Sequence, residues 1–295
     1  MSLLNQLSQL VKDPPASDVF EFSETGIAFA HPGNGKAGGH GFYPFEPGTL
    51  VVSPVEDNVH RADAVTAVLQ RIAPRDSSRK RRRAALILPD YAARVSVLDF
   101  DSFPSAPEEQ LSLIRFRLKK TLPFDIDSAA VSYFAQPAEK GATIEVVAVI
   151  VALEIIARYE ALLRSMNFHA GEVTTSGLAS LQLCPPETRA DAVNVIAKLS
   201  GKTLTVMVLR GEIVKLFRCV ALEEVTEEQI LSVLQPTLSY VEDELAARAE
   251  KLTLCGFPSG ALSSLRYEKD VLRSSFGVPG AFNAGLLGYL EGARN

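Results

Sequence analysis

The chain has 295 residues, of which 47% are hydrophobic and 22% are charged, and its formal net charge is −5. The composition excludes a disordered or fibrous chain, and the length suits two domains. The acidic balance gives no general reason to expect nucleic acid as a partner. Three cysteines far apart in the sequence indicate a reducing compartment rather than a disulfide framework. No apolar window reaches the roughly 18 residues of a membrane-spanning helix and the start lacks signal-peptide features, so we expect a cytoplasmic protein.

The N-terminal segment is expected to form a short amphipathic helix. Apolar residues recur at helical spacing over residues 3–11, before Pro14 and Pro15 end the pattern. Docking on its own domain is the simpler interpretation, and contact with a partner or a membrane surface is the alternative. The stretch "DVFEFSETGIAFAH" then predicts two strands around a tight turn, and the Gly/Pro-rich residues 31–48 predict a loop.

A basic run precedes the next predicted strand. A helix is expected over residues 61–73, and Arg79 to Arg83 lead into the apolar stretch "AALILP". Five consecutive cations can attract anionic lipid or nucleic acid, although solvated chain before a strand is the commoner case. The run is therefore a candidate for peripheral contact with an anionic membrane.

The next third of the chain predicts a small α/β unit. "RVSVLDF" alternates as a strand does, and Ser105 with Glu108 fits a capping box that opens a helix. This helix has an apolar stripe and ends before Pro123. Two more strands, "AAVSYFAQP" and "ATIEVVAVIVA", follow, and then a helix over about residues 154–166.

The chain restarts after Pro185 and Pro186 with a three-strand meander that includes "SGKTLTV". A long helix follows, with Thr226 and Gln229 as its capping box, and then a strand and a final helix of small residues. Two halves that each begin with a β meander and continue as α/β indicate an actin-like (ribonuclease H-like) two-domain fold. We expect one domain over residues 1–175, with an inserted α+β subdomain over roughly 90–140, and a second over 176–295.

Specific residues of the inserted unit resemble the PilM-type proteins. These are actin-like cytoplasmic components of the type IV pilus inner-membrane assembly platform, and related secretion platforms share their plan. The similarity rests on "LPD…R" at residues 88–94, a helix that ends in "LPF" at residues 122–124, and an alternating strand with Tyr133.

The resemblance implies a nucleotide site between two β-hairpins, each with an acidic residue near Mg²⁺ and small residues near phosphate. Every element of that site is degraded here. In the first hairpin, Glu21 and Ser23 replace the Asp and Gly of the family. In the second, which turns at Ser200 and Gly201, Ala197 replaces the acid and Leu199 a glycine. A third element retains Gly256 but has Phe257 where the family has a second glycine.

The stretch "SGKT" does not form an independent phosphate-binding loop. That motif needs a glycine where Ile196 stands and a helix after the lysine, whereas a strand is predicted here. The four histidines show no metal-ligand spacing, so we expect no metal site.

We therefore expect a non-catalytic adaptor without a cofactor, peripheral to the inner membrane. The resemblance implies that it binds the cytoplasmic tail of a bitopic membrane partner in a groove beside the inserted subdomain. The expected contact residues are an apolar floor and a cationic rim, namely Leu122, Pro123, Phe124, Arg94 and Arg115. Core packing and solvated arginines are the simpler interpretation for each residue singly. The alternative function is an ATPase that uses Glu21 in a rearranged site with ATP and Mg²⁺.

Overall fold

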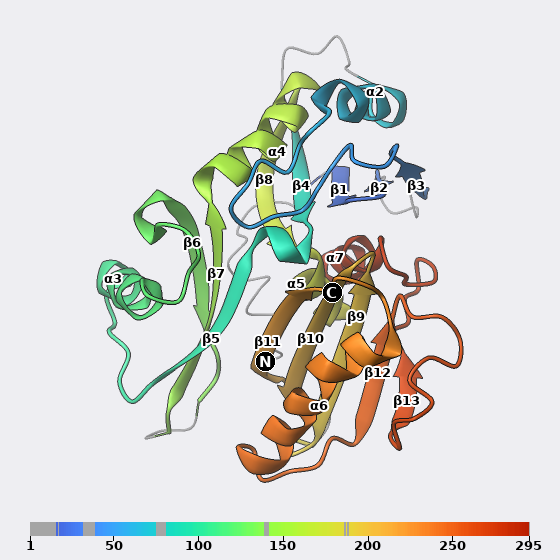
Figure 1. Cartoon of the computed structure of the whole chain (residues 1–295). Coiled ribbons are helices and arrows are strands. Elements are labelled where there is room, and N and C mark those ends of the chain that lie inside the picture. The colour runs from blue at the N-terminus through green and yellow to red at the C-terminus, as the bar shows by residue number, and fades with distance from the viewer. Residues whose placement is uncertain are drawn as a thin grey trace.

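The computed structural model describes residues 16, 18–31, 39–74, 81–138, 142–185, 187 and 189–294. The expected N-terminal helix, residues 32–38 of the Gly/Pro-rich loop, and Arg79 and Lys80 of the basic run lie outside these residues. The described part forms two five-stranded sheets, one in each half, and a three-stranded sheet beside them (Figure 1).

The first half is built on a mixed sheet with strand order β3-β2-β1-β4-β8. Its strands are β1 (Asp18–Ser23), β2 (Gly26–Ala30), β3 (His40–Pro44), β4 (Arg82–Leu88) and β8 (Phe168–Thr175). Helices α2 (Ala62–Ile72) and α4 (Leu153–Ser165) cover one face, where they pack on Phe20 and Phe22. Because side chains alternate along a strand, Val19 and Glu21 point to the opposite face. Strand β3 was expected to be loop, and it forms because an exposed edge strand tolerates glycine and proline.

The inserted subdomain consists of the sheet β5-β7-β6 and one helix. Its elements are β5 (Arg94–Phe100), α3 (Pro107–Leu118), β6 (Ala129–Ala135) and β7 (Ile144–Ala152). The insertion therefore extends beyond the expected residue 140, because β7 is the central strand of this sheet. The capping box expected at Ser105 is wrong. Ala106 is the N-cap, and its methyl side chain cannot accept a hydrogen bond. Pro107 at the first helical position has no N–H that would need an acceptor.

The second half repeats the plan with strand order β11-β10-β9-β12-β13. Its strands are β9 (Val193–Ser200), β10 (Thr203–Arg210), β11 (Ile213–Ala221), β12 (Lys251–Cys255) and β13 (Glu268–Val271). Helix α6 (Glu227–Asp243) covers one face, and its expected cap is present, with the Gln229 N–H donating to the Thr226 hydroxyl at 3.3 Å. Val195, Ala197 and Leu199 face α6.

Two helices lie at the junction of the halves. Helix α5 (Ser176–Ser180) follows β8, and α7 (Ala284–Arg294) packs beneath the first sheet although it ends the second half in sequence. The two helices approach so closely that a Cβ on Gly288 would lie 2.1 Å from the Ala179 carbonyl oxygen, and the glycine makes this approach possible. The small residues of the last helix are therefore a packing requirement, and the first half depends on the C-terminal segment.

The inserted subdomain is docked on the edge strand β11 of the second half. The Gln136 amide donates to the Val214 carbonyl at 2.8 Å and accepts from the Val214 N–H at 2.8 Å, as a neighbouring strand would. Lys215 pairs with Glu145 at 2.6 Å beside this contact. Apolar side chains from both parts form one core cluster here, among them Val147, Phe217 and Met207.

Candidate functional site

The two β-hairpins that the sequence singled out meet at the junction of the halves. The β1–β2 turn carries Glu24, and a Cβ on Gly201, in the β9–β10 turn, would lie only 3.5 Å from Glu24 Oε2. Gly201 has φ +59°, a left-handed conformation that glycine adopts without strain. The hairpin tips are therefore close to contact, with no room for a bulky group between them.

Glu21 is buried, and its carboxylate is hydrogen-bonded to α5 and α7. Its carboxylate is 1% exposed and accepts hydrogen bonds from the Leu286 N–H at 2.6 Å, the Gly285 N–H at 3.3 Å and the Ser176 hydroxyl. The two N–H groups belong to the first turn of α7 and have no partner within that helix. Burial raises the pKa of Glu21, and the nearby Lys198 ammonium opposes this rise. Glu21 thus anchors α7 to the first sheet.

Ser23 closes its own turn. Its hydroxyl donates to the Gly26 carbonyl at 2.9 Å and lies 3.2 Å from the Thr25 hydroxyl. The side chain is therefore engaged within the first hairpin.

Lys198, which sequence reasoning passed over, faces the cleft from the second hairpin together with Ser200 and Thr203. Ala197 and Leu199 point to α6, and the side chain between them points the other way. The Lys198 ammonium is 3.1 Å from Asp90 Oδ2 and donates to the Ser200 hydroxyl at 2.9 Å. Burial alone would lower the pKa of Lys198, but the carboxylates of Asp90 and Glu21 outweigh it and raise the pKa.

Asp90 accepts hydrogen bonds from residues of both halves. Besides Lys198 it accepts from the Thr205 hydroxyl at 2.9 Å and from the Gly177 N–H at 2.5 Å. Asp90 is 4% exposed and directly follows β4 and Pro89, so the end of a first-half strand brings it to the cleft. The available sequence signal was a single lysine in the apolar strand "VNVIAKLS", since a buried cation requires a partner.

Gly256 is required for local packing. It has φ +77°, and a Cβ there would lie 2.1 Å from the Leu199 carbonyl oxygen. Phe257 packs on the core of the second half. The loop after β12 is therefore pressed against β9.

A Mg²⁺-nucleotide does not fit between the hairpins in this arrangement. The remaining cavity, lined by Glu21, Asp90, Lys198 and Phe282 among others, has a volume of about 20 Å³. Such a space holds about one water, whereas ligand pockets measure roughly 300–1,000 Å³. Over the residues that the structure describes, no group of three or more His, Cys, Asp or Glu could hold a metal ion.

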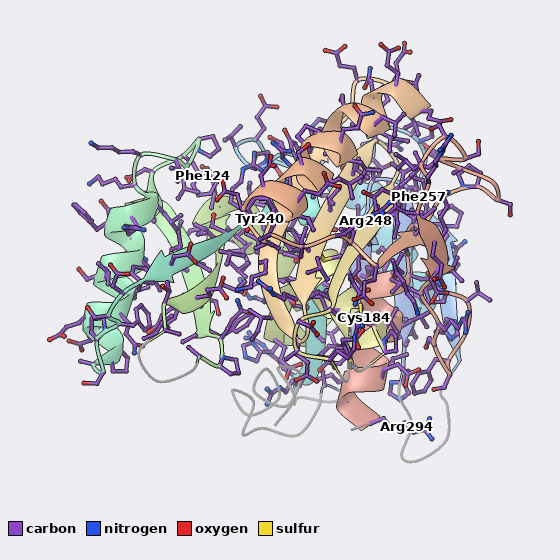
Figure 2. All side chains as sticks on the ribbon, turned by 90° about the horizontal axis from the view of Figure 1, so that it is seen from below. Phe124, Cys184, Tyr240, Arg248, Phe257 and Arg294 are labelled. Carbon is purple, nitrogen blue, oxygen red and sulfur yellow. The ribbon has the colours of Figure 1, made fainter. Side chains whose placement is uncertain are left out.

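The five residues expected to bind a partner lie along the inserted subdomain and its link to the first half. Arg115 donates to the carbonyls of Ile126 at 2.5 Å and Ala129 at 3.2 Å, so it holds the segment after α3. Arg94 lies over the Tyr91 ring at 5.0 Å. The remaining three form the "LPF" segment. Leu122 packs on the subdomain core, and Pro123 is exposed. Phe124, labelled in Figure 2, packs on the cores of both the subdomain and the first half.

The described arginines of the basic run are partly engaged in the fold. The Arg82 guanidinium lies 3.9 Å from the Phe168 ring centre and donates to the Pro74 carbonyl at 3.0 Å. Arg81 is exposed. Across the described residues, no helix combines the length and apolar character needed to cross a membrane.

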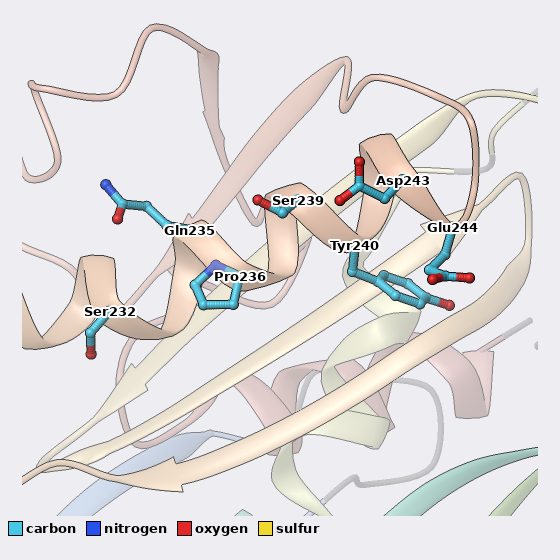
Figure 3. Close-up of a pocket in the computed structure, with 7 residues that line it drawn as sticks. All are labelled: Ser232, Gln235, Pro236, Ser239, Tyr240, Asp243 and Glu244. Atoms are coloured by element: carbon cyan, nitrogen blue, oxygen red, sulfur yellow. The ribbon is translucent and has the colours of Figure 1, made fainter.

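A second hollow, of about 620 Å³, lies along the outer face of α6 (Figure 3). All of its lining residues belong to that helix or follow it directly, and they include Pro236, Tyr240, Asp243 and Glu244. The Tyr240 hydroxyl donates to the Lys215 carbonyl at 3.4 Å. The hollow brings together no nucleophile, base or metal ligand from separate elements.

Comparisons with known proteins define the class of fold. No protein-family model matches the chain, and no curated protein sequence does. Among solved structures, a Bacteroides thetaiotaomicron protein with an actin-like ATPase fold and unknown function aligns with 88% of this chain and 92% of its own, at 12% identity and a TM-score of 0.52. The chain thus has the expected actin-like α/β fold with an inserted subdomain.

Two further structures belong to assembly machines. A PilM–PilN type IV pilus biogenesis complex contains a chain that aligns with 95% of this chain and 99% of its own, at 15% identity and a TM-score of 0.71. The cytoplasmic domain of EpsL, an inner-membrane component of the Vibrio cholerae type II secretion system, covers 94% of both chains at 12% identity and a TM-score of 0.56. The similarity to PilM-type proteins expected from the sequence is therefore present in the fold.

Proposed function

We propose that the protein is a non-catalytic adaptor of a type IV pilus or related secretion assembly platform. It acts on the cytoplasmic face of the inner membrane and binds the cytoplasmic tail of a bitopic membrane protein. The observation that carries the proposal is the cleft, where Lys198 and Asp90 occupy the space between the hairpins. The likeness to the PilM–PilN complex over 95% of the chain supports the choice of machine.

The inserted subdomain is the proposed docking region for the tail. Pro123 is exposed next to the half-buried Leu122 and Phe124, so a peptide laid over this segment would gain apolar contact. Arg115 supplies positive charge beside the segment after α3, whose backbone it also holds, and Arg94 supplies it at the link to the first half, over Tyr91. An extended peptide with apolar residues and a carboxylate suits this combination.

The alternative is an ATPase with a rearranged site. It would require Glu21 to leave the N-terminus of α7 and Lys198 to leave Asp90. Each movement would take a buried charge away from its partner, and this cost supports the non-catalytic proposal over the ATPase.

Calorimetry and tail binding test the proposal in two steps. Titration with Mg-ATP is expected to give no heat of binding, and micromolar affinity would overturn the non-catalytic assignment.

Peptides are then made from the cytoplasmic tails of single-span membrane proteins encoded by neighbouring genes, and their binding is measured by fluorescence anisotropy. One tail is expected to bind and to lose affinity with Phe124→Ser, while the matched exposed substitution Val278→Ser has no effect. Failure of every such tail would reject the adaptor role.

A further inference from the structure

One buried cation crosses the junction of the halves. Among the residues that the structure describes, Lys198 is the one buried lysine or arginine, with a side chain 2% exposed. Its partner Asp90, 1% exposed at the side chain, comes from the other half. A buried charge of either sign requires its partner, so this contact ties β9 to the end of β4.

The same pair organises polar groups from other elements. Asp90 also accepts hydrogen bonds from the Thr205 hydroxyl on β10 and from the Gly177 N–H in α5. Ser200, which accepts from Lys198, donates in turn to the Ala281 carbonyl at 2.5 Å. The network therefore joins both sheets, α5 and the segment before α7. Charge-assisted hydrogen bonds of this kind are short and directional, so they define one relative position of their donors and acceptors.

A ring contact joins the two halves beside this network, through Phe282, which lines the cavity. Phe42 on β3 stacks on Phe282 with ring centres 5.7 Å apart and planes inclined by 24°. The first of these residues belongs to the first half and the second to the segment before α7. With about 20 Å³ left inside, the closed arrangement leaves no place for a bridging ligand.

We propose that Lys198 is an internal cation that locks the two halves in one closed arrangement, so that closure is built into the chain and needs no ligand. The ammonium neutralises Asp90 and faces Glu21, the two carboxylates that would otherwise repel one another across the cleft. Surfaces to which both halves contribute, such as the contact between the inserted subdomain and β11, are consequently formed at all times. The lock goes beyond the adaptor role and would stand even if no tail bound.

The test measures the distance between the halves. Spin labels are attached through Gln70→Cys on α2 and Gln235→Cys on α6, both at exposed positions of covering helices. Labelling of the three native cysteines is slow, because burial raises the pKa of Cys184 and of Cys219 to about 12 and that of Cys255 to about 11. Double electron–electron resonance on the full chain is expected to give one narrow distance distribution, unchanged by Mg-ATP. Lys198→Met is expected to broaden it and shift it to longer distances, whereas the control Lys215→Met retains the narrow distribution.

Several outcomes would overturn the proposal. A broad or two-component distribution in the unsubstituted background would do so directly, and so would further closure on addition of Mg-ATP. A folded Lys198→Met variant with the original distance would show that packing alone holds the halves. If that variant does not fold, Lys198→Met combined with Asp90→Asn removes the unpaired charge at position 90, and an unchanged distance there would overturn the lock equally.

Discussion

Two lysine–carboxylate pairs join the halves, and they differ in burial more than in length. Lys198 and Asp90 are 3.1 Å apart with side chains 2% and 1% exposed, whereas Lys215 and Glu145 are 2.6 Å apart with side chains 19% exposed. The shorter pair is the one nearer to water. Its charges retain part of their solvation in the absence of a partner, so the separation of the atoms does not rank the two contacts.

The difference shows which of the two contacts depends on its charges. At the edge of β11, an ion pair adds to a docking surface that Gln136 and apolar side chains already form. In the cleft, the ion pair is itself the contact, and each partner would be a buried isolated charge without the other. Substitutions at the two sites should therefore have very different effects on stability.

The largest effect is expected for Lys198→Met. The substitution leaves Asp90 buried without its cation, which typically costs about 3–5 kcal/mol in free energy of unfolding. Equilibrium urea denaturation followed by circular dichroism measures this loss. Asp90→Asn combined with Lys198→Met should recover a large part of it, because position 90 then carries no unpaired charge. A loss below about 1 kcal/mol for the single variant, the range of exposed pairs, would contradict the distinction between the two pairs.

An intermediate effect is expected for Gln136→Ala. The Val214 N–H and carbonyl are buried and would lose both partners, at a cost of about 1–3 kcal/mol for a group left unsatisfied. The comparison is with Gln110→Ala, which removes contacts to Pro104 and Tyr133 inside the subdomain but none to β11. If the two variants lose equal stability, docking on β11 has no special role.

The sequence predicted the elements whose patterns are local. The meander of β9 to β11 and the cap at Thr226 follow from alternation, tight turns and one side-chain hydrogen bond, and the structure contains them. Ser105 failed as a cap because Pro107 shifts the start of α3 by its fixed backbone angle. Strand β3 was missed because pairing with β2, not its own composition, makes it a strand.

The candidate site was predictable only in part. Comparison of motifs drew attention to Ala197 and Leu199, whereas strand alternation places Lys198 between them on the cleft side. Its pairing with Asp90 joins residues 108 positions apart, a separation over which no local pattern operates. Glu21 was singled out as a residue of the expected nucleotide site, whereas its acceptance of α7 N–H groups depends on how the last helix packs. The expected partner residues of the inserted subdomain stay a prediction.

A third prediction uses pH to separate the cleft from the surface pair. Burial raises the pKa of Glu21 above the ordinary 4.5. Between pH 4.5 and the folded pKa, the folded chain therefore holds a proton on Glu21 that the unfolded chain releases. The resulting contribution to stability is complete below pH 4.5 and is lost as the pH rises towards the folded pKa. Glutamine does not titrate, so Glu21→Gln should flatten the fall in stability above pH 4.5. The amide can still accept a hydrogen bond from the Leu286 N–H and donate one to Ser176, so the packing of α7 is retained. Urea midpoints measured from pH 4.5 to 7 test this, and an unchanged slope would count against it.

The smallest effect is expected for Lys215→Met. Its pair with Glu145 is partly solvated, so the loss should be about 0.2–1 kcal/mol and should shrink when salt screens the charges. Urea denaturation at low salt and at 1 M NaCl measures both values, with Lys198→Met as the comparison. The cost of Lys198→Met should change little with salt, because buried charges are screened weakly. If the two variants respond to salt alike, the Lys198–Asp90 pair is accessible to ions, and the cleft is more open than its 20 Å³ cavity indicates.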